Sequence, residues 1–457
     1  MSRVRLPVAA GGPAPAPAPD RGRRYFLQSF GCQMNEHDAE RMAGLMEVAG
    51  YNRVERAEDA HVAIFNTCAI RENADNRLYG HLGRLRPVKD RTGIRIAVGG
   101  CQAEKDREAI LDRAPWVDVV FGTRNIDRLP ALLATVEEAG VPIVELAESF
   151  EVFPSALPAR RGSAFHAWVA IQYGCNNSCT FCIVPHVRGA EISRPVGEIV
   201  GEVRRLSEQG ITEISLLGQN VNSYGRDLTG RPIFSTLLRE LDSVEGIRRI
   251  RFTSPHPKDF KEDTARAMAE CPSVCEHLHF PLQSGSDAVL RRMKRAYSRA
   301  TYLEKVAMAR EVVPGLALTT DIIVGFPGET GEEFEDTLSL VEEVRYDSAY
   351  MFQYSSRPHT AAAEMDGQLP REVVGERFDR LLALQERISL ELNEREVGCV
   401  VEVTVESERS KRDAARATGR TRTNKLVHLD AQGLRSGDVV HARVTGARTH
   451  YLLASPA

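Results

Sequence analysis

The sequence contains no apolar run that approaches the length of a membrane span. A helix needs about 20 apolar residues to cross a bilayer, and no stretch of the 457 residues comes near that length. The N-terminal region also lacks the apolar core of about 7–15 residues found in secretory signal peptides, because its only apolar stretch, residues 6–10, ends at Gly-Gly-Pro. These absences predict a cytoplasmic protein that does not enter a membrane.

The chain has no excess of positive charge. Its 59 Lys and Arg residues against 63 Asp and Glu residues give a net charge of −4, so any patch that binds nucleic acid must be local. The nine cysteines are an odd number. That count does not fit a disulfide scaffold in a cytoplasmic chain and favours metal ligands or reactive thiols.

The first third of the chain divides into three segments. Residues 1–22 are a Pro- and Ala-rich tail that cannot bury enough apolar surface to fold, and we expect it to be disordered. Strand and helix patterns alternate over 23–147 and predict a parallel sheet with helices on its faces. The prolines and small residues of 148–163 predict a linker.

A second alternation of strands and helices occupies residues 164–396. Its six strand–helix units predict a partial (βα)6 barrel, in which functional groups stand at the C-terminal ends of the strands. Short β segments then fill 397–457 and predict a small all-β barrel. The expected fold class is therefore α/β, with a parallel-sheet domain, a partial barrel and a C-terminal β-barrel.

Three cysteines lie on one short loop directly after the predicted strand AWVAIQY. Cys175, Cys179 and Cys182 form a C-x3-C-x2-C pattern in GCNNSCTFCIVPHVRG, and three thiolates on one loop can hold a corner of a soft-metal site. Structural zinc normally has four ligands, and no fourth Cys or His stands at a customary zinc spacing. A 4Fe-4S cluster held by three cysteines would leave one iron open. Unrelated packing cysteines are the alternative, which the tight spacing disfavours.

This motif, after the first strand of a partial barrel, resembles that of the radical S-adenosylmethionine (SAM) superfamily. The resemblance implies a 4Fe-4S cluster whose open iron chelates SAM, and reduction of the cluster that cleaves SAM to a 5′-deoxyadenosyl radical. It places Phe181 near the adenine of SAM, although packing within the loop would explain the same ring. Arg188 and Arg194 could reach the SAM carboxylate or form ordinary surface ion pairs.

Three further strand ends, in LGQN, PLQSGS and VGFPG, are candidates for SAM contacts. Glycines there allow a close approach of the backbone, and Gln, Asn and Ser offer hydrogen bonds. Each strand end alone is weak support, because glycine turns are common in such places. The candidate SAM-binding residues are Phe181, Gly218, Gln219, Asn220, Gln283, Ser284, Gly285 and Gly325.

Three more cysteines, Cys32, Cys68 and Cys101, each follow a predicted strand directly. Parallel strands end at the same edge of a sheet, where such sheets bind ligands, so the three thiols can converge. A helix is expected to begin after each one, and helix N-termini favour thiolates. Buried cysteines that only pack are the alternative; that interpretation fits one such cysteine better than three at equivalent positions.

Two three-cysteine sites in this order resemble the methylthiotransferases, a branch of the radical SAM enzymes. The resemblance covers about residues 24–455 and includes GCQMNEHD, NTCAIREN, GGCQAE, SRP, LGQNVNSYG, PLQSGSD and DIIVGFPGET. It implies a second 4Fe-4S cluster, held by the N-terminal cysteines, that holds or supplies the inserted sulfur. It also implies two SAM-dependent steps, and no side chain is marked as a general acid or base. We expect Cys271, Cys275 and Cys399 to be packing residues.

The C-terminal segment carries a local excess of positive charge. Residues 398–457 hold ten Lys and Arg against six Asp and Glu, densest in KRDAARATGRTRTNK. Arg420, Arg422 and Lys425 are the candidates for RNA phosphate contacts, although a solvated charged loop explains the same composition. The pattern GRTRTNKLVHL…GDVVHARVTGARTHYL resembles the TRAM domain, an RNA-binding module of RNA-modifying enzymes, and this favours RNA.

Within the methylthiotransferases, GCQMNEHD and the basic segment are most similar to the branch that modifies isopentenylated adenosine beside the tRNA anticodon. The resemblance implies conversion of adenosine C2–H to C2–S–CH3, a tRNA partner bearing that nucleoside, a flavodoxin- or ferredoxin-like electron donor and a sulfur source; we predict a monomer. Rival substrates are threonylcarbamoyl-adenosine in tRNA or a ribosomal protein. A rival of another class is a non-catalytic iron–sulfur protein that binds RNA or senses redox state.

Overall fold

The structure, a computed structural model, describes residues 22–69, 72–147, 150, 153–409, 416–430 and 433–457. They belong to two compact units, unit 1 (Met1–Gly162) and unit 2 (Ser163–Ala457). The predicted tail lies outside the described residues except for Gly22, and so does part of the predicted linker. In the described part of the chain, no helix is long and apolar enough to cross a membrane.

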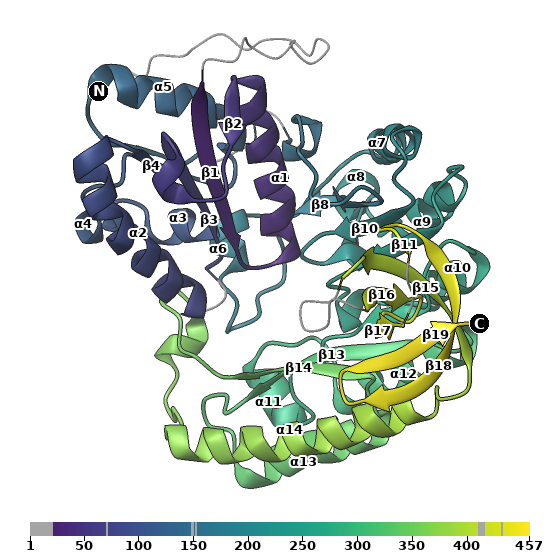
Figure 1. Cartoon of the computed structure of the whole chain (residues 1–457). Helices are drawn as coiled ribbons and strands as arrows, with labels where there is room; N and C mark the ends of the chain where they lie inside the picture. The colour runs from purple at the N-terminus through teal and green to yellow at the C-terminus, as the bar shows by residue number, and fades with distance from the viewer. Residues whose placement is uncertain (1–21, 70–71, 148–149, 151–152, 410–415, 431–432) are drawn as a thin grey trace. The chain divides into compact units, whose positions relative to one another are not determined.

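Unit 1 is built on a six-stranded sheet of parallel strands in the order β2-β1-β3-β4-β5-β6 (Figure 1). The strands are β1 (Arg23–Phe30), β2 (Tyr51–Arg53), β3 (Val62–Thr67), β4 (Arg95–Gly100), β5 (Val119–Phe121) and β6 (Ile143–Glu145). All six residues of β3 are buried, as expected for a parallel strand covered on both faces. The edge strand β2 was not predicted, since three residues are too few to show a period.

Helices cover both faces of this sheet. They are α1 (Gln33–Val48), α2 (Glu72–Thr92), α3 (Cys101–Asp106), α4 (Ala109–Arg113) and α5 (Leu129–Ala139), with short 3-10 turns η1 (Ala57–Asp59), η2 (Ile126–Arg128) and η3 (Pro154–Ala156). Ile64 packs into one hydrophobic cluster with residues of α1 and α5, and Phe65 into another with residues of α2. The predicted helix over 103–114 is divided at Arg107, whose φ is +51°.

Unit 2 holds the predicted partial barrel, and the structure confirms it. Six parallel strands form two three-stranded sheets, and an isolated parallel bridge pairs Ile250 of the first sheet with Val274, which precedes the second sheet in the chain. The strands are β7 (His166–Ala170), β10 (Glu213–Leu217), β11 (Arg249–Phe252), β12 (His277–His279), β13 (Ala317–Val324) and β14 (Ser348–Gln353). A small antiparallel ladder pairs β8 (Gln172–Tyr173) with β9 (Ile192–Ser193).

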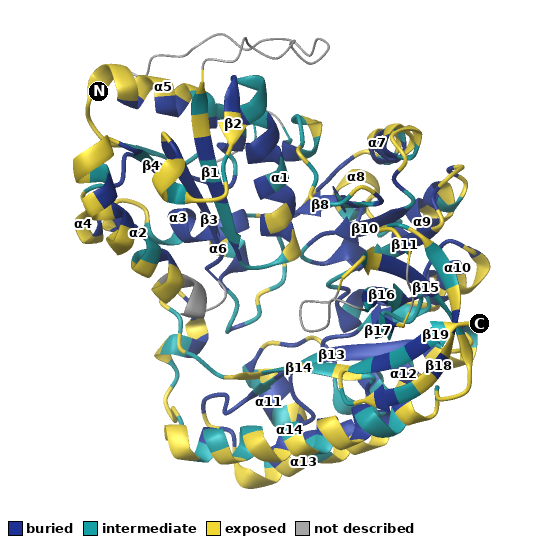
Figure 2. Cartoon of the chain, viewed as in Figure 1, coloured by how far each residue is buried: buried dark blue, intermediate teal, exposed yellow. Residues whose placement is uncertain are grey.

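Helices pack against one side of these strands and bury the main core of unit 2 (Figure 2). They are α7 (Val196–Glu208), α9 (Phe234–Asp242), α10 (Glu262–Glu270), α11 (Asp287–Arg292), α12 (Arg299–Val312), α13 (Gly331–Val344) and α14 (Arg371–Glu394). The short helices α6 (Val184–Arg188) and α8 (Arg226–Thr229) and the turns η4 (Val221–Ser223), η5 (Pro257–Asp259) and η6 (Ala361–Glu364) lie in the connections. Leu318 and Ile322 of β13 belong to this core, whereas Thr319 and Asp321 alternate with them and face the other side.

The predicted C-terminal β-barrel is present and belongs to unit 2. It closes in the order β15-β16-β17-β19-β18, with strands β15 (Val400–Ser407), β16 (Ala417–Thr421), β17 (Leu426–Leu429), β18 (Val439–Arg448) and β19 (Tyr451–Pro456). β16 was not predicted: its sequence, ATGRT, has the composition of a loop, yet Ala417 and Thr421 are buried within the barrel. The segment expected to be one basic loop is therefore partly a strand.

Candidate functional site

The N-terminal cysteines follow three neighbouring strands. Cys32 caps α1 just after β1, Cys68 directly follows β3, and Cys101 is the first residue of α3 after β4. Since β1, β3 and β4 are adjacent and parallel, the three residues stand at one edge of the sheet of unit 1, as the sequence predicted. Cys68 and Cys101 are buried and Cys32 is partly exposed.

Two glycines bring the backbone close to the end of β3. Gly31 has a φ of +140°, and a Cβ on it would stand 2.4 Å from the Cβ of Cys68. Gly100 has a φ of +91°, and a Cβ on it would stand 2.3 Å from Oδ1 of Asn66. Both positions require glycine. The residues before Cys32 and Cys101 are thereby packed onto β3, which fits a shared site for the three thiols.

Two buried asparagines line this edge and were missed by the sequence analysis. Asn66 Nδ2 donates to the carbonyl of Asn35 at 2.7 Å, and Asn35 Nδ2 lies 3.3 Å from Asn66 Oδ1. The thiol of Cys32 is 3.2 Å from Asn35 Oδ1. Asn35 lies in GCQMNEHD and Asn66 lies in NTCAIREN. Their position beside the cysteines was the only feature of the sequence that could have marked them as part of the site.

The second triplet lies on the loop between β8 and α6 in unit 2. Cys175 N donates to the carbonyl of Gly189 at 3.0 Å, and Cys182 N donates to that of Cys179 at 3.1 Å, which closes a tight turn. Thr180 fixes the loop to the segment after α11, because its N–H donates to the carbonyl of Met293 at 3.1 Å. All three cysteines of the loop are partly exposed.

The thiols of this loop influence one another's ionisation. Burial raises the pKa of Cys182 to about 12 and raises that of Cys175 above its usual range, and the neighbouring Cys179 acts in the same direction on both. No disulfide joins any of the nine cysteines, all of which are described. Among the described residues, no three His, Cys, Asp or Glu side chains are already gathered as ligands of a metal ion. A soft-metal cluster fits this donor set if binding deprotonates the thiols and draws them together.

Three buried amide oxygens, in β8 and directly after β10, have no partner among the described residues. Oε1 of Gln219, Oε1 of Gln172 and Oδ1 of Asn222 are buried and find no hydrogen-bond donor among the described residues. Gln172 is the residue of β8 nearest to Gly218. A buried polar atom without a partner is costly, so these oxygens fit a ligand that carries donors, as the ammonium and ribose hydroxyls of SAM do. Gln219 was predicted from the sequence as a SAM contact, whereas Gln172 and Asn222 were not.

Two other candidate SAM residues, Asn220 and Gln283, differ in their surroundings. Asn220 already uses its amide: Nδ2 donates to Asp259 Oδ2 at 2.8 Å, and Oδ1 accepts from His256 N at 3.3 Å. Gln283 has a φ of +70° and pairs with β13 through an isolated bridge. A non-glycine residue in this conformation is strained, and such strain is often found at functional sites.

Ser284, Gly285 and Gly325 face the helices of unit 2. Ser284 is fully buried and its Oγ lies 3.3 Å from Oγ1 of Thr337 on α13. A Cβ on Gly285 would stand 2.5 Å from Cα of Thr337, and one on Gly325 would stand 2.5 Å from Cγ2 of Val374. These contacts assign the three residues to helix packing at the strand ends.

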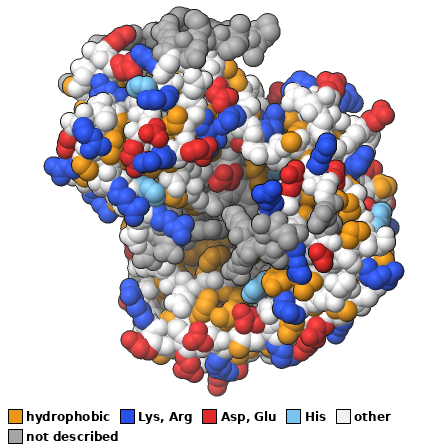
Figure 3. All heavy atoms as spheres, viewed as in Figure 1, with side chains coloured by type: hydrophobic (Ala, Val, Ile, Leu, Met, Phe, Trp, Pro, Cys, Tyr) orange, Lys and Arg blue, Asp and Glu red, His pale blue; other side chains and the backbone are white. Residues whose placement is uncertain are grey.

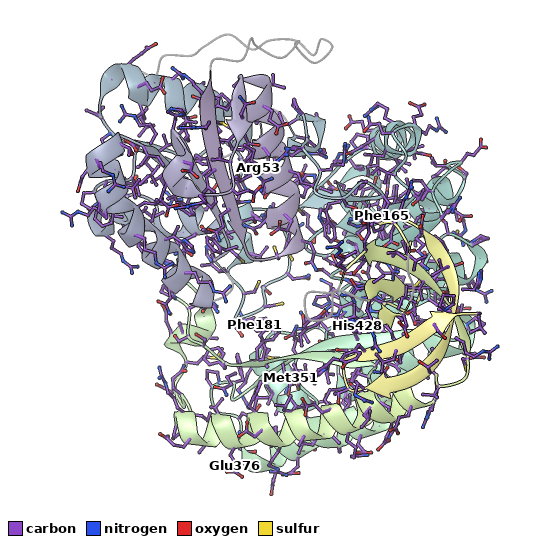
Figure 4. All side chains as sticks on the ribbon, in the orientation of Figure 1. Arg53, Phe165, Phe181, Met351, Glu376 and His428 are labelled. Carbon is purple, nitrogen blue, oxygen red and sulfur yellow. The ribbon has the colours of Figure 1, made fainter. Side chains whose placement is uncertain are left out.

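The aromatic ring of the loop packs against unit 2. Phe181, labelled in Figure 4, is partly buried and packs against the cluster of Val289, Met293, Phe326 and Ala362, as Ile323 of β13 does. Arg194 is 4% exposed, and its Nη1 lies 2.8 Å from Glu202 Oε2. It forms a buried ion pair rather than the surface pair considered from the sequence. Arg188 is also buried.

The three candidate RNA contacts differ in how they are held. Arg422 forms an ion pair with Glu276 at 2.7 Å, and Lys425 forms one with Asp347 at 2.9 Å. Arg420 is 38% exposed on its side chain and lies 3.1 Å from Glu406 of the same barrel. Two of the three cations therefore hold the C-terminal barrel on the partial barrel, and they do not stand on one open basic loop.

The remaining cysteines agree with the sequence only in part. Cys271 and Cys275 are buried, 4% and 2% exposed, as packing residues should be. Cys399 is exposed, and the expectation that it packs was wrong. It directly follows the last turn after α14, at the start of the C-terminal barrel, where the chain runs over the surface.

Three known families match the chain. Residues 169–341 match the Radical SAM superfamily, residues 394–457 match the TRAM domain, and residues 24–122 match the Uncharacterized protein family UPF0004. The first match contains the loop of Cys175, Cys179 and Cys182, and the third contains Cys32, Cys68 and Cys101.

Curated relatives match over almost the whole chain. A protein of Acidothermus cellulolyticus named tRNA-2-methylthio-N(6)-dimethylallyladenosine synthase is 55% identical over 97% of this chain and 90% of its own length. Relatives with the same name from Saccharopolyspora erythraea and Streptomyces coelicolor are both 54% identical, over 94% and 100% of this chain and 90% of each relative.

Solved structures with a similar fold are far more distant in sequence. The radical S-adenosylmethionine methyltransferase TsrM from Kitasatospora setae, with cobalamin and a 4Fe-4S cluster bound, gives a TM-score of 0.56 at 14% identity and covers 75% of this chain and 74% of that chain. The cobalamin-dependent S-adenosylmethionine radical enzyme OxsB gives 0.51 at 14% identity and covers 80% and 56%. These likenesses show a shared fold alone.

Proposed function

The chain belongs to the family of tRNA-2-methylthio-N(6)-dimethylallyladenosine synthases, and from this premise we propose that it is a radical SAM tRNA methylthiotransferase. Its reaction converts the C2–H bond of N6-isopentenyladenosine, next to the tRNA anticodon, into C2–S–CH3. The observation that carries the proposal is the 55% identity over 97% of the chain. The two cysteine triplets support it independently: one follows three adjacent strands of unit 1, and the other lies on the loop after β8 in unit 2.

The loop of unit 2 is the place for the cluster that works with SAM. We assign Cys175, Cys179 and Cys182 as its ligands, since three thiols on one loop would leave the fourth iron of the cluster without a cysteine ligand. When bound there, a 4Fe-4S cluster and SAM supply the radical that initiates chemistry at an unactivated C2–H bond. The amide oxygens of Gln172 and Gln219, which have no partner among the described residues, would accept hydrogen bonds from SAM and orient it. Phe181 lies on the same loop and would border the bound SAM.

The sheet edge of unit 1 is the place for a second 4Fe-4S cluster. We assign Cys32, Cys68 and Cys101 as its ligands because they follow three adjacent parallel strands. The helices α1 and α3 begin at two of these cysteines, and the positive end of a helix favours a thiolate. The role of this site is to hold the sulfur that enters the product.

The substrate base needs a surface within the partial barrel. Tyr350 and Phe352 alternate along β14 with Met351, which packs into the core on the helix side. They are 56% and 41% exposed, and hydrophobic side chains gather over the β13–β14 region in Figure 3. Aromatic rings stack on bases and pack against apolar chains. We therefore propose these two rings as the contact for the adenine and its isopentenyl group.

The C-terminal barrel contacts the tRNA backbone in this account. Arg420 is the phosphate contact, because its guanidinium is partly exposed and its partner Glu406 lies on the same barrel. Arg422 and Lys425 act indirectly by fixing the barrel on the core. Turnover needs two SAM molecules, one for the methyl group and one for the radical, an electron donor of the flavodoxin or ferredoxin kind, and a sulfur source. We further propose a monomer that acts in the cytoplasm.

Mass spectrometry of tRNA nucleosides tests the function. A strain that lacks the gene should accumulate N6-isopentenyladenosine and lose its 2-methylthio derivative, and the intact gene should restore it. If threonylcarbamoyl-adenosine or a ribosomal protein lost its methylthio group instead, the substrate assignment would be wrong. If no methylthio group changed and the purified protein released no 5′-deoxyadenosine from SAM, a non-catalytic iron–sulfur protein would be the better account.

A further inference from the structure

A buried arginine faces the cysteine loop of unit 2. Arg295 follows α11 and is 9% exposed. Its Nη1 donates to Sγ of Cys179 at 3.3 Å, its Nε donates to the hydroxyl of Tyr297 at 2.9 Å, and its Nη2 donates to the carbonyl of Pro281 at 3.3 Å. The guanidinium is therefore fixed on one side by protein oxygens and directed on the other at a thiol that we assign to the cluster.

The anchor of this arginine is itself rigid. The Tyr297 hydroxyl donates to the carbonyl of Leu282 at 2.8 Å and also lies 3.0 Å from that of Pro281, and the ring is buried. The cysteine loop is tied to the same stretch of chain, since Oγ1 of Thr180 donates to the carbonyl of Arg292 at 2.9 Å. The loop and Arg295 are thus both held by the stretch of chain from Pro281 to Tyr297.

The charge of Arg295 has no carboxylate partner within the described part of the chain. Arginine stays protonated in proteins, and among the described residues no Asp or Glu forms an ion pair with this side chain. Burying a cation without an anionic partner is costly. The side chains that its nitrogens contact are a thiol and a phenol, so the group that would balance the charge is a thiolate of the cluster site.

We propose that Arg295 is a positioning residue that sets the reduction potential of the cluster held by Cys175, Cys179 and Cys182. This inference rests on the proposed function, because it takes those cysteines as ligands. One electron enters the cluster from the external donor, and its negative charge increases by one. A fixed cation and a hydrogen bond at a ligand sulfur stabilise the reduced state more than the oxidised one. Arg295 therefore raises the potential and makes reduction by the donor easier.

Redox titration of a single-cluster protein tests this. The full chain with Cys32, Cys68 and Cys101 replaced by Ala serves as the parent, so that electron paramagnetic resonance reports only the other cluster. Arg295→Met in this parent should make reduction about tenfold less favourable, a shift of about 59 mV to lower potential for one electron. Arg295→Lys keeps the charge and should recover part of the shift. Tyr297→Phe loosens the anchor of Arg295, and its reduction potential should lie between that of Arg295→Met and that of the parent.

Arg292→Met is the matched control. Arg292 precedes Arg295 on the same stretch, but its side chain pairs with Glu333 at 2.6 Å, so the potential should stay at the parental value. An Arg295→Met protein with about four irons and the parental potential would overturn the proposal. If that variant bound no iron, parental potentials in both Arg295→Lys and Tyr297→Phe would overturn it instead. A parent that bound no cluster at all would contradict the assigned ligands and hence the proposed function.

Discussion

Arg422 of the C-terminal barrel and Glu276 of the partial barrel form a two-point ion pair. Nε of Arg422 lies 2.8 Å from Oε2 and Nη2 lies 2.7 Å from Oε1 of a residue 146 positions away. Nη2 of Arg422 also donates to the carbonyl of Val274 at 2.8 Å. The partial barrel also supplies a donor, because Arg251 of β11 donates to the carbonyls of Arg422 and Thr421 at 2.9 Å. The turn after β16 is therefore a docking element.

Charge reversal tests this docking role. Arg422→Glu and Glu276→Arg should each lower the stability of the full chain by about 1–3 kcal/mol, because each leaves a partly buried charge or carbonyl without its partner. The double variant should recover part of the loss, which a double-mutant cycle on thermal unfolding would measure. Additive losses with no recovery would show that the pair does not couple the two barrels.

Salt dependence separates docking from RNA binding. With Arg420, Arg422 and Lys425 all changed to Ala, tRNA binding should weaken and depend less on salt, because phosphate contacts release counterions. Among the single variants, Arg420→Ala should reduce the salt slope by about 1. Cleavage of SAM without tRNA should persist as the control. Unchanged tRNA affinity in the triple variant would contradict the assignment of these residues.

The proposed stacking surface predicts a loss of substrate affinity. Tyr350→Ala should weaken binding of an anticodon stem-loop bearing isopentenyladenosine by about 1–3 kcal/mol, or roughly 5- to 150-fold, while Tyr350→Phe should retain most of it. Leu228→Ala on α8 is the control, since Leu228 is a similarly exposed apolar side chain, 47% exposed, outside this surface. Equal affinities for the Ala variant and the parent, at equal iron content, would remove Tyr350 from the site.

Histidines in the partial barrel predict a loss of stability in mild acid. Burial lowers the pKa of His166 to about 4 from its ordinary value of 6.5. The unfolded chain therefore binds this proton first, and the stability that the neutral ring contributes is complete above pH 6.5 and is lost as the pH falls toward 4. The full difference corresponds to about 3 kcal/mol.

Thermal unfolding at pH 7 and pH 4.5 measures this contribution. His166→Asn should be less stable than the parent at pH 7, because the ring Nε2 lies 3.0 Å from Ser215 Oγ, but it should lose less stability between the two pH values. The burial of His277 lowers its pKa to about 3, so a smaller slope should remain in the variant. Parallel curves for parent and variant would contradict the assignment to His166.

The sequence predicted the strand ends that carry the cysteines but not the groups around them. Cys32, Cys68 and Cys101 could be placed at one edge because parallel strands in an alternating pattern end together, and β1, β3 and β4 are indeed neighbours. Asn35 and Asn66 could not be predicted, because an asparagine beside a motif looks the same whether it is buried or exposed. Their contact depends on the close approach that Gly31 and Gly100 allow.

In the basic segment, the sequence predicted one shared role for three cations that the structure separates. Composition marks Arg420, Arg422 and Lys425 as one charged loop, but the partners that decide their roles are far away in the chain. Glu276 and Asp347 precede β12 and β14, and no local pattern connects them to residues near 420. Charge density predicts where cations are, whereas tertiary contacts decide which of them remain available to RNA.

The division of labour between the two cysteine triplets is the central claim, and one reconstituted variant tests it most directly. The chain with Cys32, Cys68 and Cys101 changed to Ala should hold about four irons, whereas the unsubstituted chain should hold about eight. Incubated with SAM, a reductant and tRNA bearing isopentenyladenosine, it should release 5′-deoxyadenosine but form no 2-methylthio nucleoside, both measured by mass spectrometry in the same reaction. Methylthiolated product from this variant would contradict the sulfur role of the unit 1 site. Loss of 5′-deoxyadenosine with four irons still bound would contradict the separation of the two roles.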